Sequence, residues 1–191
     1  ADAQRIIRIG SLEKRIEING NAKFDLLEDL PRSGEKERMQ KLFNLKGDEP
    51  VLVAGSIRGE EDRILLESYE KITAAVPETL LVLAPRHIKR SAHILSRIRS
   101  RGLTCQLRSR LDPEQHPRTA SVVLIDTMGE LESIYSIASV VFSGGSLVPL
   151  GGQNILEAAV WGKPVLYGPS MEDFMEAKAM LEAAGGGMEV S

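Results

Sequence analysis

The chain of 191 residues carries 24 Lys and Arg against 27 Asp and Glu, and 42% of its residues are hydrophobic. This length and composition fit one ordinary globular domain, and the formal net charge of -3 gives no general attraction to nucleic acid. A single cysteine excludes a disulfide framework and a cysteine-ligated metal cluster, and no apolar run approaches the roughly 18 residues of a membrane-spanning helix.

The first fifty residues contain short, separate predicted elements. "ADAQRIIRIG" at 1–10 predicts a helix that Gly10 stops, and "RIEINGNAKFD" at 15–25 predicts a strand that runs into a tight turn. "SGEKERMQKLFNL" at 33–45 predicts a helix that begins at Ser33 or Gly34. Because the chain lacks an initiating Met and a signal-peptide pattern, we expect it to be part of a longer protein.

From residue 51 onward, short apolar runs alternate with helical patterns. The runs are almost continuously apolar, as strands covered on both faces are. Repeated strand–helix units predict an α/β fold with a doubly wound, Rossmann-like parallel sheet. "GGG" at 185–187 predicts a turn before the last residues. The predicted strands are 51–55, 80–85, 103–107, 121–126, 139–145 and 164–169, and the predicted helices are 59–75, 88–101, 129–138, 153–161 and 172–184.

The segments that follow the predicted strands are glycine-rich or polar. Ligands of such sheets bind beyond the carboxyl ends of the strands, and helix N-termini there favour anions. These segments therefore predict a phosphate-containing ligand along this edge. Neither a P-loop motif nor a G-x-G-x-x-G motif after the first strand is present, which argues against a P-loop NTPase and a dinucleotide fingerprint. The segments are "GSIRGEE", "PRHIKR", "DTMGEL", "SGGSLVPLGGQNILE" and "GPSMEDF".

Two glycine pairs stand between the fifth predicted strand and the next helix. Gly144-Gly145 lets the chain turn without Cβ clashes, and Gly151-Gly152 is expected to present backbone N–H groups to a ligand. Asn154 and Glu157 share a face of the first helical turn, where the carboxylate suits a sugar diol. The alternative is helix capping by Asn154 or Gln153, with Glu157 complementing the helix dipole. The preceding glycines favour the ligand.

The segment from Arg86 to Arg118 is basic, with nine Lys and Arg and only Asp112 and Glu114 as acids, a local charge of +7 against -10 for the remainder. A solvated helix face explains this composition best. The alternative is a basic surface that faces the phosphates of a ligand or anionic lipid head groups. No aromatic residue interrupts the segment, which argues against single-stranded nucleic acid.

In combination, order and spacing, several of these motifs resemble the carboxyl-terminal half of the 3-deoxy-D-manno-octulosonic acid (Kdo) transferases of lipopolysaccharide assembly. The resemblance extends from about Ala1 to Val190. It implies half of a two-domain GT-B glycosyltransferase fold. The motifs are "GNAKFD" at 20–25, "VAGSIRGEE" at 53–61, "APRH" at 84–87, "DTMGEL" at 126–131 and "GGSLVPLGGQNILE" at 144–157.

The resemblance also implies how the activity is divided between two domains. The carboxyl-terminal domain binds the donor CMP-Kdo, and the amino-terminal domain takes the lipid A precursor at the cytoplasmic face of the bacterial inner membrane. Residues 1–25 would be an interdomain segment from the end of the amino-terminal domain. Residues 26–191 would be a donor-binding domain, truncated at its carboxyl terminus and soluble as a fragment.

Donor-binding roles follow from the resemblance position by position. Arg86 would offer its planar fork of donors to a phosphate or to the Kdo carboxylate, the alternative being a surface arginine. The family usually has His where this chain has Gln153, so we expect no proton-transfer role there. The implied donor-binding residues are Pro85, Arg86, His87, Met128, Gly129, Glu130, Gly152, Asn154, Ile155, Leu156 and Glu157, and Lys23 and Ser56 are possible cleft residues.

The general base of the family is a glutamate of the amino-terminal domain, so no catalytic residue is expected in this chain. We expect the chain to bind a cytidine nucleotide weakly and to turn over little alone. Neither a metal nor a cofactor is expected, since no Asp-x-Asp motif is present. Asp126 and Glu130 could form a metal pair, but a helix-capping role for Asp126 explains them better.

Two other functions stay open. One is a domain like those of the NDP-sugar 2-epimerases, which share the GT-B architecture. The other is a non-catalytic nucleotide-binding module, in which the glycine loop serves only the geometry of the fold.

Overall fold

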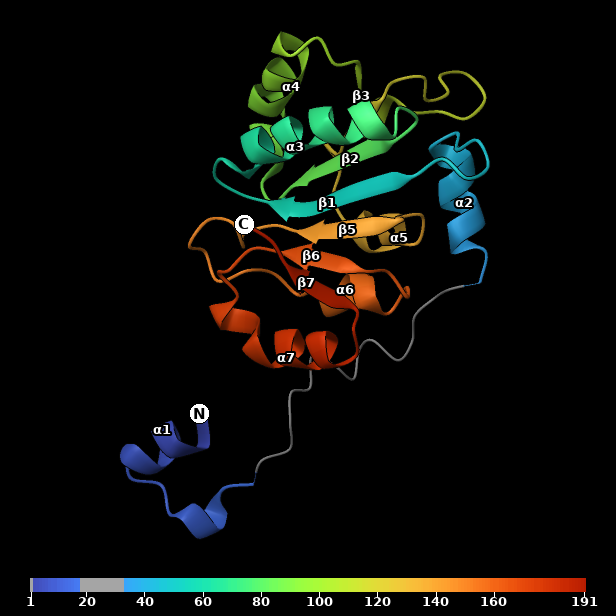
Figure 1. Ribbon diagram of the computed structural model, residues 1–191. Coiled ribbons are helices and arrows are strands. Elements are labelled where there is room, and N and C mark those ends of the chain that lie inside the picture. The colour runs from blue at the N-terminus through green and yellow to red at the C-terminus, as the bar shows by residue number, and fades with distance from the viewer. Residues whose placement is uncertain (1, 18–32) are drawn as a thin grey trace.

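The structure, a computed structural model, describes residues 2–17 and 33–191 (Figure 1). The predicted amino-terminal helix is confirmed as α1 (Asp2–Arg8), and it is followed by Gly10 at a φ of 108°. A short 3-10 helix, η1 (Glu13–Arg15), stands where the strand over 15–25 was predicted to begin. The remainder of that strand, and Lys23 with it, lies outside the described residues.

The described residues form one parallel sheet of seven strands in the order β3-β4-β2-β1-β5-β6-β7. The doubly wound fold and all six predicted strands are confirmed. The first strand extends two residues beyond its predicted end, the second has its predicted bounds, and the other four are shorter than predicted. The strands are β1 (Val51–Ile57), β2 (Leu80–Pro85), β3 (Cys105–Leu107), β4 (Val122–Leu124), β5 (Val140–Ser143), β6 (Val165–Tyr167) and β7 (Gly187–Glu189).

The predicted turn at the last glycines is present at Gly185, but the strand that follows it was not predicted. Gly187–Glu189 pairs with β6 through Leu166 and Met188. Met188 is 64% exposed, so the segment has no run of buried apolar residues by which the sequence could mark it as a strand. Its hydrogen bonds to β6 make it an edge strand.

Helices cover both faces of the sheet (Figure 1). One hydrophobic core joins α3 and α4 to one face, and a second core joins α2, α5, α6 and α7 to the other. The α-helices are α2 (Glu35–Leu42), α3 (Glu61–Ala75), α4 (Ser91–Ser100), α5 (Leu131–Tyr135), α6 (Leu156–Ala159) and α7 (Met175–Ala183), and the 3-10 helices are η3 (Ile88–Arg90), η4 (Arg108–Arg110) and η5 (Glu172–Phe174).

The alternation of side chains along β1 divides its residues between the two cores. Val51 and Val53 face one core, while Leu52 and Ala54 face the other. Both sets are buried, which is why the sequence of this strand reads as continuously apolar rather than alternating.

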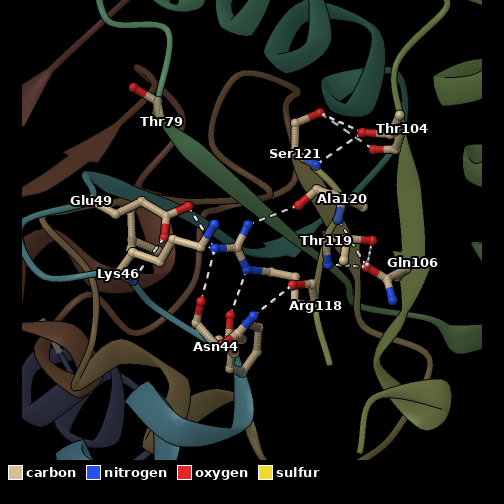
Figure 2. A network of polar contacts seen from close by, with 12 residues as sticks. Asn44, Lys46, Glu49, Thr79, Thr104, Gln106, Arg118, Thr119, Ala120 and Ser121 are labelled. Atoms are coloured by element: carbon tan, nitrogen blue, oxygen red, sulfur yellow. Dashed lines mark hydrogen bonds and ion pairs between the residues drawn. The ribbon is translucent and has the colours of Figure 1, made fainter. Parts of the chain in front are cut away.

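A buried arginine fixes the amino ends of the central strands (Figure 2). Arg118 is 7% exposed and places one terminal nitrogen 2.6 Å from both carboxylate oxygens of Glu49. It also donates to the carbonyl oxygens of Phe43 and Ala120. Arg118 therefore joins the end of α2 to the start of β4, at the edge opposite the segments that follow the strands.

The basic segment is largely neutralised by acids of neighbouring elements. Asp62, fully buried at the start of α3, pairs with Arg90 at 3.1 Å and with Arg97 at 2.8 Å. The interpretation of residues 86–118 as a solvated face is therefore only partly right, because five of their cations form ion pairs. Those cations are Arg90, Arg97, Arg101, Arg108 and Arg118.

Candidate functional site

The winding of the sheet changes direction between β1 and β5. The chain leaves β1 through α3 on one face and reaches β5 from β4 through α5 on the other. In a parallel sheet this position opens a crevice at the carboxyl ends of the strands, where ligands bind. Arg58 follows β1, Arg86 follows β2 and the glycine-rich loop follows β5, so all three belong to this edge.

A buried carboxylate occupies the first amides of the glycine-rich loop. Glu61 Oε2 accepts a hydrogen bond from the Gly145 N–H at 2.7 Å, and Oε1 accepts from the Ser146 and Leu147 N–H groups at 3.0 Å. The same carboxylate accepts from the Arg58 N–H at 2.7 Å, and Glu61 is fully buried. An anion of the protein itself therefore fills the turn after β5.

The second glycine pair is also bound within the protein. The Gly151 N–H donates to Ser170 Oγ at 3.0 Å, and the Gly152 N–H donates to the Gly145 carbonyl oxygen at 2.9 Å. The expectation that these amides are free for a ligand is therefore wrong. Gly152 is buried, and a Cβ on it would lie 2.4 Å from Met171 Sδ. Close packing between loops explains this glycine.

The first pair behaves as predicted. Gly145 turns the chain with a φ of 70°, and a Cβ on Gly144 would lie 2.5 Å from Ile57 Cα. Only glycine fits where β5 leaves the sheet beside the end of β1.

The start of α6 shows only part of the capping that was considered as an alternative, because its N-cap residue is Ile155, which forms no side-chain cap hydrogen bond. Asn154 Oδ1 accepts a hydrogen bond from the Leu156 N–H at 3.2 Å. Ile155 is fully buried, so its side chain belongs to the core, and Leu156 packs partly buried against the same core. The Gln153 side chain donates to the Gly152 carbonyl oxygen at 2.6 Å. The Asn154 side chain thus makes a local structural contact within the protein.

Glu157 and Arg86 interact electrostatically across the edge. Burial raises the pKa of the Glu157 carboxyl above its ordinary value, and the Glu132 carboxylate adds to this rise. The Asn154 side chain and the Arg86 guanidinium act in the opposite direction. Two of the predicted donor-binding residues, from the segments after β2 and β5, are thus close enough for the charge of one to act on the other.

Tyr135 completes this cluster from α5. Burial raises the pKa of its hydroxyl, and the charge of Glu157 raises it further. The hydroxyl lies against Gly55, where a Cβ would come within 2.1 Å of Tyr135 Oη. Tyr135, on which the charge of Glu157 acts, therefore stands beside β1.

The segment after β4 contains an exposed methionine and a glutamate that is hydrogen-bonded within the protein. Met128 is 71% exposed, and Gly129 has a φ of 80°. Glu130 accepts hydrogen bonds from Arg108 at 2.6 Å and from the Thr127 hydroxyl, so both of its oxygens are used. The Ile125 N–H donates to the Leu83 carbonyl oxygen at 2.8 Å, which places this segment beside the one that carries Arg86.

Asp126 does not cap α5. Its carboxylate accepts from the Ser109 N–H at 2.8 Å and from the Ser109 hydroxyl at 2.6 Å, so it holds η4. The capping prediction for Asp126 is therefore wrong. Among the described residues, no group of three His, Cys, Asp or Glu is arranged to hold a metal ion.

The remaining predicted residues take varied positions along the edge. Pro85 is buried in β2, and His87 is exposed beside Arg86. Ser56 is half-buried and has a φ of 53°, a strained value for a residue other than glycine. An apolar pocket of about 430 Å³ lies elsewhere, between α3 and the chain end, lined by Ile72, Phe142, Leu166, Val190 and other residues.

Sequence reasoning missed Glu61, Arg58 and Tyr135. The acids at 60–62 are typical of a first helical turn, where they complement the helix dipole, and nothing in their order shows which of them becomes buried. A lone cation within a glycine-containing loop is the signal that could have drawn attention to Arg58. Within the described ranges, no helix is long and apolar enough to cross a membrane.

Several known proteins are similar to this chain. A bifunctional glycosyltransferase/methyltransferase of Fusobacterium nucleatum is 34% identical over 94% of this chain and 28% of its own length. A 3-deoxy-D-manno-octulosonic acid transferase of Haemophilus influenzae is 33% identical over 98% of this chain and 43% of its own length. This chain therefore spans less than half of the length of these curated relatives. No protein-family model matches.

Among solved structures, the C-terminal CMP-Kdo binding domain of WaaA from Acinetobacter baumannii superimposes with a TM-score of 0.73. The superposition covers 84% of this chain and 83% of that domain, at 25% sequence identity. The likeness thus extends over nearly the whole of a single domain that was solved on its own.

Proposed function

This chain is a homologue of the Kdo transferases with the fold of their carboxyl-terminal domain, and we propose that it binds the nucleotide sugar CMP-Kdo as the donor half of such an enzyme. In the parent protein, the bound Kdo would be transferred to a lipid A precursor during lipopolysaccharide biosynthesis. Residues 26–191 would form the donor domain and residues 1–25 the connection to the acceptor domain.

The observation that carries the proposal is the position of Arg86 and Glu157, which follow β2 and β5 at the same carboxyl edge of the sheet, with the charge of Arg86 acting on the Glu157 carboxyl. Arg86 is exposed and can pair with a phosphate, while Glu157 is half-buried and can accept hydrogen bonds from ribose hydroxyls. A partly buried carboxyl group whose pKa is raised by burial is typical of a binding or catalytic site.

The other predicted residues would act around this pair. The Arg86 N–H donates to the Ile57 carbonyl oxygen at 3.1 Å, so the end of β1 holds the backbone from which that side chain extends. Met128, Gly129 and Glu130 would line the nucleotide from the segment after β4, with His87 at the rim. Gly152, Ile155 and Leu156 would shape the loop rather than contact the donor through their side chains.

In the reaction, this domain would stabilise the charge of the departing cytidylate. Arg86 would neutralise the phosphate as the bond to Kdo breaks, which is an electrostatic contribution to catalysis. The general base would come from the acceptor domain, so we expect little turnover by this chain alone. We place the parent at the cytoplasmic face of the inner membrane. The unpaired cations of the basic segment are then the groups that could meet anionic lipid.

Calorimetric titration of the chain with CMP tests the proposal. We expect Arg86→Ala and Glu157→Ala each to weaken binding roughly tenfold or more, the size of a lost charge-assisted hydrogen bond. Arg99→Ala is the control, because Arg99 is an exposed cation in the last turn of α4. Unchanged affinity in both site variants would contradict the proposal.

Thermal unfolding separates the competing functions. Protection by CMP but not by UDP supports a cytidylate donor, because only a ligand that binds the folded state raises the melting temperature. Protection by UDP alone would favour the epimerase-like domain. Absence of any nucleotide-dependent shift would favour a domain in which the glycine loop serves only the fold.

A further inference from the structure

Arg58 follows β1 at the position where the winding of the sheet reverses. Its N–H donates to Glu61 Oε2 at 2.7 Å, and its carbonyl oxygen accepts from the Glu61 N–H at 3.1 Å. These two hydrogen bonds close a tight turn before α3. The backbone of Arg58 is therefore fixed, and only its side chain can adjust.

The Arg58 side chain lies over the glycine-rich loop. A Cβ on Gly145 would lie 3.4 Å from Arg58 Cδ and 3.6 Å from Gln153 Nε2, so the side chains of Arg58 and Gln153 approach the same glycine. Arg58 Nε is buried and has no hydrogen-bond partner in the described part of the chain. Buried N–H donors are normally satisfied, and an unpaired one destabilises the folded state.

No acidic side chain of the described residues pairs with Arg58. Glu61 is the buried acid close to Arg58 along the chain. Both of its carboxylate oxygens already accept hydrogen bonds from backbone N–H groups. Arg90 and Arg97, in contrast, share the buried carboxylate of Asp62. Arg58 is thus a cation with an unused donor at the ligand-binding edge.

A second arginine follows the neighbouring strand. Ile57 and Pro85 are paired across β1 and β2, and Arg58 and Arg86 are the residues that follow them. Neighbouring strands lie about 4.8 Å apart, so two like charges emerge from adjacent chain ends. Such a pair repels unless an anion lies between or above the two guanidinium groups.

We infer that Arg58 is a second anion-binding residue of the donor site, which acts with Arg86 on an anionic oxygen of the nucleotide sugar. The inference rests on the proposed function. The ligand oxygen belongs either to the phosphate or to the carboxylate of the sugar acid, since a guanidinium pairs with both in the same way. The unpaired Nε supplies one of the donors.

The test compares CMP, cytidine and CMP-Kdo as ligands of the whole chain. Arg58→Gln removes the charge and Arg58→Lys keeps it, while Arg99→Gln is a matched loss of charge on an exposed residue of α4. We expect Arg58→Gln to weaken CMP roughly tenfold or more, with cytidine affinity and melting temperature nearly unchanged. Arg58→Lys should recover part of the loss.

The pattern of losses identifies the anion. Loss of CMP affinity assigns Arg58 to the phosphate, and a loss confined to CMP-Kdo assigns it to the sugar carboxylate. Equal losses for CMP and cytidine together with a lower melting temperature would show a structural residue and overturn the inference. So would wild-type affinities for all three ligands in Arg58→Gln. A wild-type chain that binds none of them would overturn the proposed function itself.

Discussion

The Glu61 carboxylate accepts a hydrogen bond from the Gly145 N–H at 2.7 Å across 84 residues of sequence. This contact joins the turn after β1 to the turn after β5, the two segments that border the crevice. The shape of the glycine-rich loop therefore depends on the buried Glu61 of another element as well as on its own glycines.

Replacement of Glu61 by Gln should destabilise the chain by about 2–4 kcal/mol, because the new NH₂ group faces N–H donors and leaves them unsatisfied. Urea denaturation measures the change. Glu78→Gln is the control, since Glu78 is exposed, and should alter the free energy of unfolding by less than about 0.5 kcal/mol. Equal effects of the two substitutions would mean that the Glu61 contacts contribute little.

Arg118→Met should cost about 3–5 kcal/mol, because it leaves the largely buried Glu49 carboxylate without its partner. The double variant with Glu49→Gln should cost clearly less than the sum of the two single variants, since the second substitution removes the stranded charge. Equilibrium unfolding of the four proteins gives the coupling energy. Strictly additive losses would show that the pair does not interact.

Glu157 should make stability decline with pH. Its pKa is raised in the folded chain, mainly by burial, so the folded state holds the proton more tightly than the unfolded state. Its contribution to the free energy of unfolding therefore falls as the pH rises from about 4.5 through the raised value, and is constant above it.

Glu157→Gln removes this decline, so the variant should gain stability relative to the wild type between pH 4 and pH 7, while it binds CMP more weakly. Denaturation at several pH values and titration with CMP check both parts. A stability difference that is independent of pH would contradict the electrostatic account of the site.

Cys105 should react slowly in the folded chain. Burial raises the pKa of its thiol to about 11, from an ordinary value of 9.0. At pH 8 the thiolate fraction should be on the order of 100-fold lower than in the unfolded chain, and the rate of disulfide exchange with a chromogenic reagent should fall accordingly. Similar rates with and without denaturant would refute the burial of the sulfur.

Local sequence patterns determined the strands and the edge of the sheet at which the candidate site lies. The apolar runs at 51–55 and 80–85 identify buried parallel strands because both of their faces are covered. The ends of parallel strands lie at one edge, so the sequence also placed Arg86 and Glu157 at the same edge of the sheet. Gly145 could be expected at a turn because its conformation is a local property.

Tertiary structure alone decided which polar groups are used internally. The N–H groups of Gly151 and Gly152 look free in the sequence, yet Ser170 and Gly145 accept their hydrogen bonds. Glu61 and Glu60 are adjacent acids, but only Glu61 is buried, because the turn after β5 packs onto it. Burial and pairing depend on contacts between residues far apart in the chain. No local sequence pattern encodes which distant residue will form such a contact.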